Sequence, residues 1–358
     1  MKFISNKQSS FLPLCFDDQV QHLLLGCSNL AEKWIAYKDS LPKDIWINPL
    51  VLPNSELVNH INGLGQREVL MKEQHIIARF DRISINNVDP INIEYNGKVT
   101  IISDFSDFLD NNAEEIIRDC KKLEGNINYH SSQEKVFIHS TAKVDQVIMN
   151  TDRGPIFIGK GTHIMDGAIL KGPIAIMDHS IVKMGSKIYP GTTIGPHCTV
   201  AGEIKNSIIH ECTNKGHEGY LGDSILGRWN NLGGGTTVSN VSNTFMRIKT
   251  QDWNTGKTIT LPTIKRGVIT GDFVKTGIIT KINSGTKIGS FSSIINSRAI
   301  TGNIPPLTWL TDNKNQKYLL DKAKTHAQNQ MILKSKSWND YWENQLQRHL
   351  NEIQKPMI

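Results

Sequence analysis

The chain has 358 residues, of which 38% are apolar and 21% charged, and a formal net charge of +6 at pH 7. This composition is typical of a globular chain with room for two domains, and it excludes a small protein that depends on disulfides. No dense basic run with interleaved aromatic residues indicates a nucleic-acid partner, and no apolar stretch approaches the roughly 20 residues of a membrane helix.

Cysteine usage and the N-terminus predict the compartment. The five cysteines are odd in number and form no CxxC pair, which favours reduced thiols over a disulfide framework or a zinc knuckle. The first residues hold one lysine and then polar side chains, with no continuous apolar segment of the kind found in a signal peptide. We therefore expect a cytoplasmic protein.

Residues 1–135 are predicted to form a small α/β domain. Residues 32–39 and 112–125 have the composition of helices, and residues 82–88 and 98–103 that of strands. In the second helix Asn112 is the predicted N-cap, with Glu115 three residues on. Asp104 and Asp107 precede this helix and are expected to be its solvated flank rather than a metal-binding pair.

A six-residue repeat dominates residues 136–303. Aliphatic residues recur at Ile158, Ile164, Leu170, Ile176, Val182, Ile188, Ile194 and Val200, and many follow a small residue by two positions: Thr162, Ala168, Ser180, Ser186, Thr192 and Cys198. After a shift of phase the pattern resumes through Ile208, Leu226, Leu232 and Val238, with Ser224, Asn230 and Thr236 as the small partners, and later through Ile282, Ile288, Ile294 and Ile300. A period of six fits a triangular coil with one short strand per face, the aliphatic residue pointing inward and the small residue at the corner. The repeat predicts a parallel β-solenoid.

Two segments depart from the repeat. Residues 241–265 are too long and polar for a corner, and we expect them to loop out, across a neighbouring subunit or as a disordered insertion. The polar tail from about residue 318 to 354 is predicted to be helical. One of its faces carries Trp338, Trp342, Leu346, Leu350 and Ile353, which should pack on the solenoid or on a sister chain rather than bind a cofactor.

Several blocks of sequence resemble one enzyme family. They are "FLPLCFDDQVQHLLLGCSNLAEKW", "WINPLVLPN", "GPIFIGKGTHIMDGAILKGP", "KMGSKIYPGTTIGP" and "NKGHEGYLGDSILGRWNNLGGGT". The chain resembles the bifunctional UDP-N-acetylglucosamine pyrophosphorylase/glucosamine-1-phosphate acetyltransferase family, and in it a sugar nucleotidyltransferase subgroup with a shortened N-terminal half. The resemblance implies a reduced nucleotidyltransferase-like domain over residues 1–135, a left-handed β-helix of hexapeptide acyltransferase type over 136–303, and a helical tail over 304–358.

The resemblance also implies roles for residues of the last block. His217 matches the general base of the acetyltransferase, and Tyr220, Asn231 and Asn240 match positions that hold or orient the amino sugar. Lys205 matches a lysine that meets the sugar phosphate, and we expect the nearby Lys215 to be a second phosphate contact. A histidine with a pKa near 6.5 suits this chemistry, because acetyl transfer from a thioester needs a group that takes the acceptor's proton. The alternative is that His217 and Tyr220 are polar corner residues of a solenoid without a substrate.

The chain lacks three arginines that the family carries. Asp18 and Leu24 stand where two phosphate-clamping arginines are expected, and an aspartate there repels phosphate. We therefore predict that the N-terminal domain does not transfer nucleotides. Tyr189 replaces an arginine that grips the sugar phosphate, which leaves the acceptor open among glucosamine-1-phosphate, another amino sugar and a nucleotide sugar.

The remaining motifs predict neither a metal site nor a phosphate-binding loop. His139, His163, His179, His197 and His210 lack the HxxH or HxxxH spacing of a zinc site, so we expect no metal. The three glycines at 233–235 lack the context of a phosphate loop and are expected to be a tight coil segment.

Three functions follow from these observations. The leading hypothesis is a homotrimeric transferase that uses acetyl-CoA or another acyl-CoA as co-substrate and acts on an amino sugar or a sugar-phosphate-type acceptor. The alternative is a sugar-1-phosphate nucleotidyltransferase, which would need Mg²⁺. The third is a non-catalytic scaffold or sugar-nucleotide-binding protein.

Overall fold

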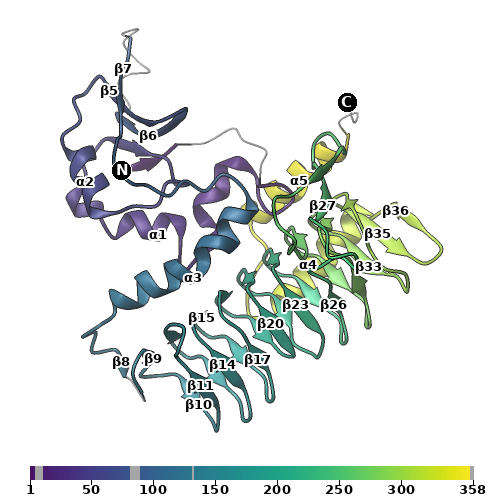
Figure 1. Cartoon of the computed structure of the whole chain (residues 1–358). Helices are drawn as coiled ribbons and strands as arrows, with labels where there is room; N and C mark the ends of the chain where they lie inside the picture. The colour runs from purple at the N-terminus through teal and green to yellow at the C-terminus, as the bar shows by residue number, and fades with distance from the viewer. Residues whose placement is uncertain (5–10, 81–88, 131–132, 355–358) are drawn as a thin grey trace. The chain divides into compact units, whose positions relative to one another are not determined.

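The computed structural model describes residues 1–4, 11–80, 89–130 and 133–354 and divides into two compact units. The first unit comprises Met1–Phe11, Phe16–Leu24 and Ser28–Phe108. The second comprises Leu12–Cys15, Leu25–Cys27 and Leu109–Ile358 (Figure 1). The strand predicted at 82–88 lies outside the described residues.

The first unit is built on a five-stranded sheet in the order β1-β4-β6-β5-β7. Its strands are β1 (Lys2–Phe3), β4 (Ile45–Ile47), β5 (Glu68–Lys72), β6 (His75–Phe80) and β7 (Ile91–Glu94). The helices are α1 (Leu30–Ile35), α2 (Ser55–Asn62) and two 3₁₀ turns, η2 (Asp17–His22) and η3 (Lys38–Ser40). The helix predicted at 32–39 is thus confirmed as α1 and η3, and α1 starts with a capping box between Asn29 and Glu32.

The strand predicted at 98–103 is wrong. This segment makes one isolated antiparallel bridge, between Val51 and Ile101. The pairing stops because Asn54 turns away to cap α2, where its side-chain oxygen accepts a hydrogen bond of 2.8 Å from the Leu57 N–H. Its amide nitrogen, rather than its main chain, donates to the Lys98 carbonyl.

Helix α3 (Phe105–Lys121) begins earlier than predicted. Asp104 is its cap, with Oδ1 accepting a bond of 2.5 Å from the Ser106 N–H, while Asp107 accepts one of 2.6 Å from the Ser103 N–H. These two carboxylates therefore start the helix rather than flank it, and the prediction of Asn112 as N-cap is wrong. Asn112 lies in the buried face of the helix, and Glu115 pairs with Arg118 at 2.7 Å.

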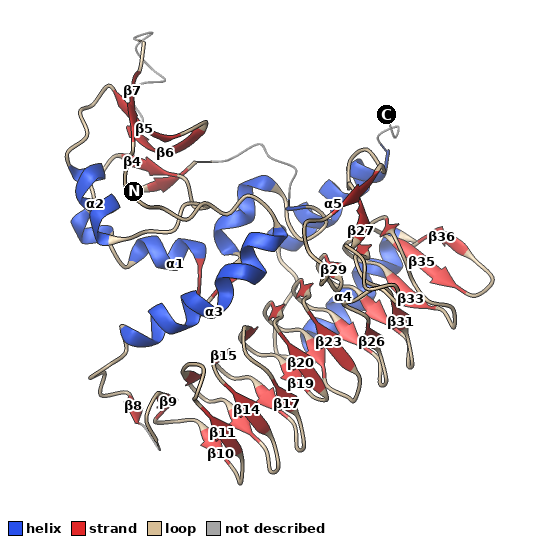
Figure 2. Ribbon diagram, viewed as in Figure 1, coloured by secondary structure: helices blue, strands red, loops and turns tan. Residues whose placement is uncertain are grey.

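The second unit is a coil of short parallel strands arranged in three faces (Figure 2). The first face carries β9 (Val136–His139), β12 (Ile156–Ile158), β15 (Ile174–Ile176), β18 (Thr192–Ile194), β21 (Ile208–Ile209), β24 (Ile225–Leu226), β29 (Ile269–Thr270), β32 (Lys287–Ile288) and β34 (Asn303–Ile304). The second carries β10 (Lys143–Val144), β13 (His163–Ile164), β16 (Ile181–Val182), β19 (Thr199–Val200), β22 (Asn214–Lys215), β25 (Asn231–Leu232), β30 (Lys275–Thr276), β33 (Ser293–Ile295) and β35 (Thr308–Thr311). The third carries β11 (Ile148–Asn150), β14 (Ile169–Lys171), β17 (Lys187–Ile188), β20 (Glu203–Lys205), β23 (Tyr220–Gly222), β26 (Thr237–Val238) and β31 (Lys281–Ile282).

Antiparallel strands flank this coil. β8 (Tyr129–His130) pairs with β9 at the start, and β36 (Asn315–Lys317) pairs with β35 at the end. We call the corners the 1–2, 2–3 and 3–1 edges, after the faces that they join.

The hexad residues form the interior of the coil. The aliphatic members named above are all buried, and so are their small partners at the corners. One detail differs, because Ile209 and not Ile208 pairs with Ile194 and joins the central cluster. The 3–1 edge between β20 and β21 is shorter than the one between β17 and β18, which moves the inward position by one residue. The predicted order of an α/β region, a parallel β-helix and C-terminal helices is confirmed.

Residues 241–265 leave the coil between β26 and β29 without breaking its ladder, since Ile225 of β24 pairs directly with Ile269 of β29. They form a hairpin of β27 (Lys249–Gln251) and β28 (Thr258–Thr260). Thr250 Oγ1 donates to the Gly285 carbonyl at 2.7 Å, and Lys287 Nζ donates to the Gln251 carbonyl at 2.8 Å. The segment is therefore an ordered hairpin docked on the coil, rather than the disordered alternative.

Helices α4 (Leu320–Ile332) and α5 (Asp340–Gln354) pack along the 1–2 edge. The edge presents Cys212, Trp229, Phe273, Phe291 and Leu307, all with positive φ. The ring of Trp342 meets that of Phe273 edge-on at 4.9 Å, and Trp338, Leu346 and Leu350 join the same cluster. The predicted packing of this face on the solenoid is confirmed for these residues. No described helix is long and apolar enough to cross a membrane.

Candidate functional site

His217 lies on the 2–3 edge, between β22 and β23, and its side chain is exposed. A Cβ atom added to Gly234, on the next coil, would lie 3.7 Å from Cβ and Cγ of His217, so the histidine sits over a residue without a side chain. Within the described parts of the chain its imidazole has no hydrogen-bond partner. The ring is thus available to a ligand at this edge.

The main chain around His217 is held from two sides. The Gly235 N–H donates to the Glu218 carbonyl at 3.0 Å, and Lys215 Nζ donates to the His217 carbonyl at 2.6 Å. Gly219 has a φ of 129°, and a Cβ there would come within 2.1 Å of the Thr236 carbonyl oxygen. Only glycine fits at position 219.

The third face carries Lys205 and Tyr220, and Asn240 follows this face at the adjoining 3–1 edge. Lys205 of β20 is in register with Gly222 of β23. The Tyr220 hydroxyl lies over Gly222, since a Cβ at Gly222 would be 2.3 Å from it. Burial, with smaller contributions from Asp223 and Glu203, raises the pKa of Tyr220 to about 12. The phenol therefore stays neutral and can donate a hydrogen bond on the face that also carries Lys205.

Asn240 orients groups at the adjoining 3–1 edge. Its amide nitrogen donates to Asp223 Oδ2 at 2.5 Å, and the amide nitrogen of Asn206 donates to Asp223 Oδ1 at 2.7 Å. Asn240 also hydrogen-bonds to Tyr220 and thereby favours the ionised form of that phenol slightly. The buried Asp223 carboxylate thus accepts hydrogen bonds from two amides, one from the 3–1 corner of the preceding coil and one from that of the next.

Asn231 lies on the second face, apart from the Lys205 and Tyr220 group. It is exposed and in register with Asn214 of β22 and Lys275 of β30. The side-chain oxygen of Asn214 is buried and has no hydrogen-bond partner among the described residues. Burial lowers the pKa of Lys275 to about 8. Sequence reasoning missed Asn214 and Lys275, because neither is separated from Asn231 by a whole number of six-residue repeats.

Lys215 does not lie at the surface. It is in register with the inward Val200 and is only 2% exposed. This placement argues against the phosphate contact expected for Lys215, because a ligand on the faces of the coil does not reach an ammonium inside it.

Apolar side chains continue the 2–3 edge beyond Gly234. Ile278, Ile279 and Ile295 are 76%, 64% and 50% exposed. Ile279 donates its N–H to the Gly234 carbonyl and has a φ of 57°, a strained conformation for a β-branched residue. Such strain and such exposed apolar residues are typical of functional surfaces.

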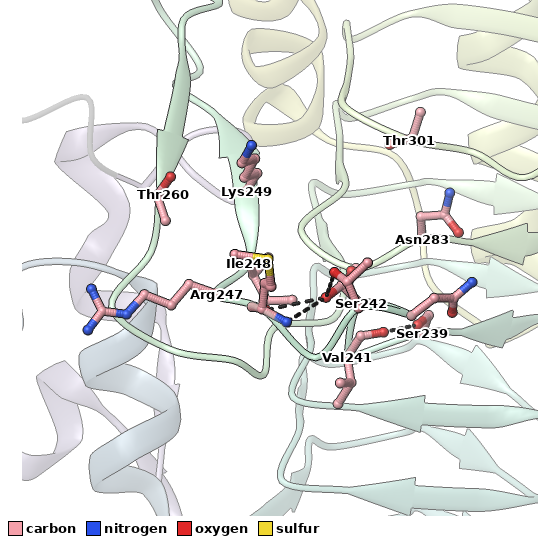
Figure 3. Close-up of a pocket in the computed structure, with 13 residues that line it drawn as sticks. Ser239, Val241, Ser242, Arg247, Ile248, Lys249, Thr260, Asn283 and Thr301 are labelled. Carbon is pink, nitrogen blue, oxygen red and sulfur yellow. Dashed lines mark hydrogen bonds between the residues drawn. The ribbon is translucent and has the colours of Figure 1, made fainter.

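A separate pocket of about 830 Å³ lies between the hairpin and the coil. Its walls include Arg247 and Lys249 on one side and Ser242 and Asn283 on the other (Figure 3). Figure 3 shows both cations extending away from Ser242 and Asn283. The two cations therefore do not converge on one point with the polar groups of the coil.

The three residues that stand where the family carries arginines, Asp18, Leu24 and Tyr189, lie in different environments. Asp18 is exposed in η2, and Leu24 is buried in β2 (Leu24–Leu25), which pairs with β3 (Ser28–Asn29). Tyr189 follows β17 and is near enough to Tyr220 to raise its pKa slightly. No group of three or more metal-ligating side chains occurs in the part of the chain that the structure describes.

Known proteins resemble parts of the chain. Residues 35–127 match the family model described as "Sugar nucleotidyl transferase", which begins beyond Asp18 and Leu24. The "Bifunctional protein GlmU" of Gloeobacter violaceus is 29% identical over 150 residues, covering 41% of this chain and 28% of that protein. The "Bifunctional sugar-1-phosphate nucleotidylyltransferase/acetyltransferase" of Sulfurisphaera tokodaii is 27% identical over 152 residues, covering 37% of each. The chain thus spans well under two thirds of these relatives.

Solved structures give weaker likenesses. The UDP-N-acetylglucosamine acyltransferase of Francisella novicida is 13% identical with a TM-score of 0.27, covering 54% of this chain and 72% of that one. AntD, an N-acyltransferase from Bacillus cereus, is 17% identical with a TM-score of 0.23, covering 60% and 96%. The strand pairing itself establishes the parallel β-helix. The resemblance predicted from the motifs, to the GlmU-like family that joins a sugar nucleotidyl transferase domain to a C-terminal β-helix, is confirmed.

Proposed function

We propose that the protein transfers an acyl group from acetyl-CoA or another acyl-CoA to an amino sugar or sugar-phosphate-type acceptor, with His217 as general base. The observation that carries this proposal is the unengaged imidazole of His217 on an edge between two polar faces. Lys205 and Tyr220 lie on one face and Asn231 on the other. Similarity to the bifunctional nucleotidylyltransferase/acetyltransferase of Sulfurisphaera tokodaii supports it.

The reaction requires His217 to take a proton from the acceptor and then to give it to the CoA sulfur. The acceptor nitrogen or oxygen attacks the thioester carbonyl carbon as His217 takes its proton, the C–S bond breaks, and the CoA sulfur leaves as a thiol after receiving that proton. Lys205 is the group suited to a phosphate on the acceptor, because its side chain is cationic and its strand is in register with Gly222, over which the neutral Tyr220 phenol lies. The exposed isoleucines beyond Gly234 suit the apolar part of the acyl donor.

We propose further that the active form is a homotrimer whose neighbouring coils close over the 2–3 edge. An exposed base in open water is a poor catalytic site, since water exclusion strengthens the electrostatic interactions there. Multi-angle light scattering should give three times the 40.2 kDa of the chain. A monomeric mass for an active preparation contradicts this part.

Thiol release from acetyl-CoA, with a panel of amino sugars and their 1-phosphates, tests the activity. His217→Ala should lower the rate roughly 10²- to 10⁴-fold. His130→Ala is the matched control, since His130 is also exposed but lies in β8, outside the site. Turnover that is equally fast in His217→Ala refutes the proposal.

Nucleotidyl transfer is the second candidate, because residues 35–127 match a sugar nucleotidyl transferase model. Asp18 and Leu24 in place of two arginines weigh against it. Pyrophosphate release from UTP, dTTP or CTP with Mg²⁺ and a sugar 1-phosphate distinguishes the two. We expect none, and measurable release establishes the second function.

A further inference from the structure

One position in the interior column of the second face breaks the aliphatic pattern. The column runs through Ile164, Val182 and Val200, then Lys215, then Leu232. Lys215 is 2% exposed, and it is one of the largest fully buried side chains in the described structure. Taking an ammonium out of water opposes folding, and an aliphatic residue of similar size fits such a column without that cost. Packing therefore does not explain a lysine here.

The hydrogen bonds of Lys215 show where its charge acts. Nζ donates to the Ala201 carbonyl at 2.9 Å and to the His217 carbonyl at 2.6 Å. Both acceptors are main-chain atoms at the 2–3 edge, on two successive coils. Bonds from an ionised donor are about twice as strong as those between neutral groups. The lysine thus ties the peptide of His217 to the preceding coil from inside the solenoid.

The segment that carries His217 needs such a restraint. Gly216 and Gly219 flank it, and glycine allows the main chain a wide range of conformations. The imidazole itself has no hydrogen-bond partner within the described residues, so no hydrogen bond of the ring fixes its direction. Three successive carbonyls of this corner accept hydrogen bonds: that of His217 from Lys215, that of Glu218 from the Gly235 N–H, and that of Gly219 from the Glu203 N–H at 3.3 Å. The bond from Lys215 is the one from an ionised side chain.

We propose that Lys215 is a positioning residue, which holds the His217 peptide so that the imidazole is aimed at the acceptor. This proposal rests on the proposed function, in which His217 is the base. Lys215 touches no substrate and acts only through His217.

Lys215→Met tests the proposal, because methionine keeps the unbranched chain and removes the charge and the donors. Leu232→Met is the matched control, one coil further in the same column. In Lys215→Met we expect kcat to fall roughly 10- to 100-fold with KM for the acceptor unchanged within about twofold, since misplacing a catalytic group affects the chemical step. Leu232→Met should change neither.

Hydrogen–deuterium exchange gives a readout that does not depend on activity. Peptides covering residues 214–222 should exchange faster in Lys215→Met than in wild type and in Leu232→Met. Unchanged exchange in Lys215→Met overturns the proposal. So does faster exchange in Lys215→Met together with an unchanged kcat, when His217→Ala inactivates the enzyme. If His217→Ala retains full turnover, the proposed function has failed, and exchange alone then decides whether Lys215 restrains this corner. Lys215→Leu replaces Lys215→Met should the latter not fold.

Discussion

The buried ammonium of Lys215 predicts a specific dependence of stability on pH. Burial lowers its pKa from 10.5 to about 8 in the folded protein, and Glu218 opposes only part of that effect. Below pH 8 both the folded and the unfolded chain hold the proton. Between pH 8 and 10.5 the folded chain has released it while the unfolded chain keeps it. Because the unfolded state then binds more protons, the free energy of unfolding rises with pH across this window.

The size of the effect follows from the shift. A difference of about 2.5 pKa units at about 1.4 kcal/mol per unit corresponds to roughly 3 kcal/mol. Lys275 titrates in the same window, so the quantity to measure is the difference between wild type and Lys215→Met. Lys275 contributes equally to both proteins and cancels.

Urea denaturation at intervals from pH 7 to 10.5 measures this difference. The unfolding free energy of wild type, relative to that of Lys215→Met, should stay constant up to about pH 8 and then rise by roughly 3 kcal/mol. A difference that stays constant within about 0.5 kcal/mol over the whole range refutes the reasoning, because it places the ammonium in a water-like environment. A difference that falls with pH refutes it equally, because the sign is fixed by the lowered pKa.

Three further predictions concern packing, the acceptor site and the co-substrate. Asn112→Ala should destabilise the second unit by about 2–5 kcal/mol in urea unfolding, because it leaves the buried Gly26 N–H and Gly191 carbonyl unpaired; Asn112 bonds them at 2.8 and 2.9 Å. Gly222→Ala should displace the Tyr220 hydroxyl and raise KM for the acceptor while KM for acetyl-CoA stays unchanged; an unchanged acceptor KM contradicts the assigned site. Acetyl-CoA at a hundredfold excess over its Kd should add about 2.7 kcal/mol of stability in a thermal shift, whereas UTP with Mg²⁺ adds none. The opposite pattern contradicts the proposed function.

The solenoid was predictable from sequence because its physics is local and repeated. Each inward position such as Ile164 or Ile288 must be aliphatic, and each corner such as Ser180 must be small, so one rule recurs through the chain. The role predicted for His217 came from the resemblance of its motif, and not from the phase of the repeat. Where the coil shortens, as between β20 and β21, the rule misplaced the inward residue by one, since corner length is set by backbone geometry.

Long-range contacts account for the other errors. Asn112 has the local signature of an N-cap, yet its side chain serves main-chain groups at Gly26 and Gly191, far away in sequence. Lys215 is charged and lies two residues before His217, which suggests a ligand contact. Only its register with Val200 shows that its side chain points inward. Asn214 pairs with Asn231 over a coil shorter than three hexads, and Lys275 pairs with it across the 241–265 insertion, so the six-residue count reaches neither.

The unbroken pairing of Ile225 with Ile269 has a consequence for how this protein can change over evolution. Strand pairing on either side fixes both ends of the 241–265 insertion, so the structure of the coil does not depend on the length of that insertion. The entropy of closing a loop grows only slowly with its length, by about 0.6 kcal/mol for each doubling. This corner is therefore a site where inserted segments of different length and chemistry are tolerated, while the strand register at His217, Lys205 and Asn231 stays unchanged. Specificity carried by such a segment can diversify faster than the scaffold that presents the base.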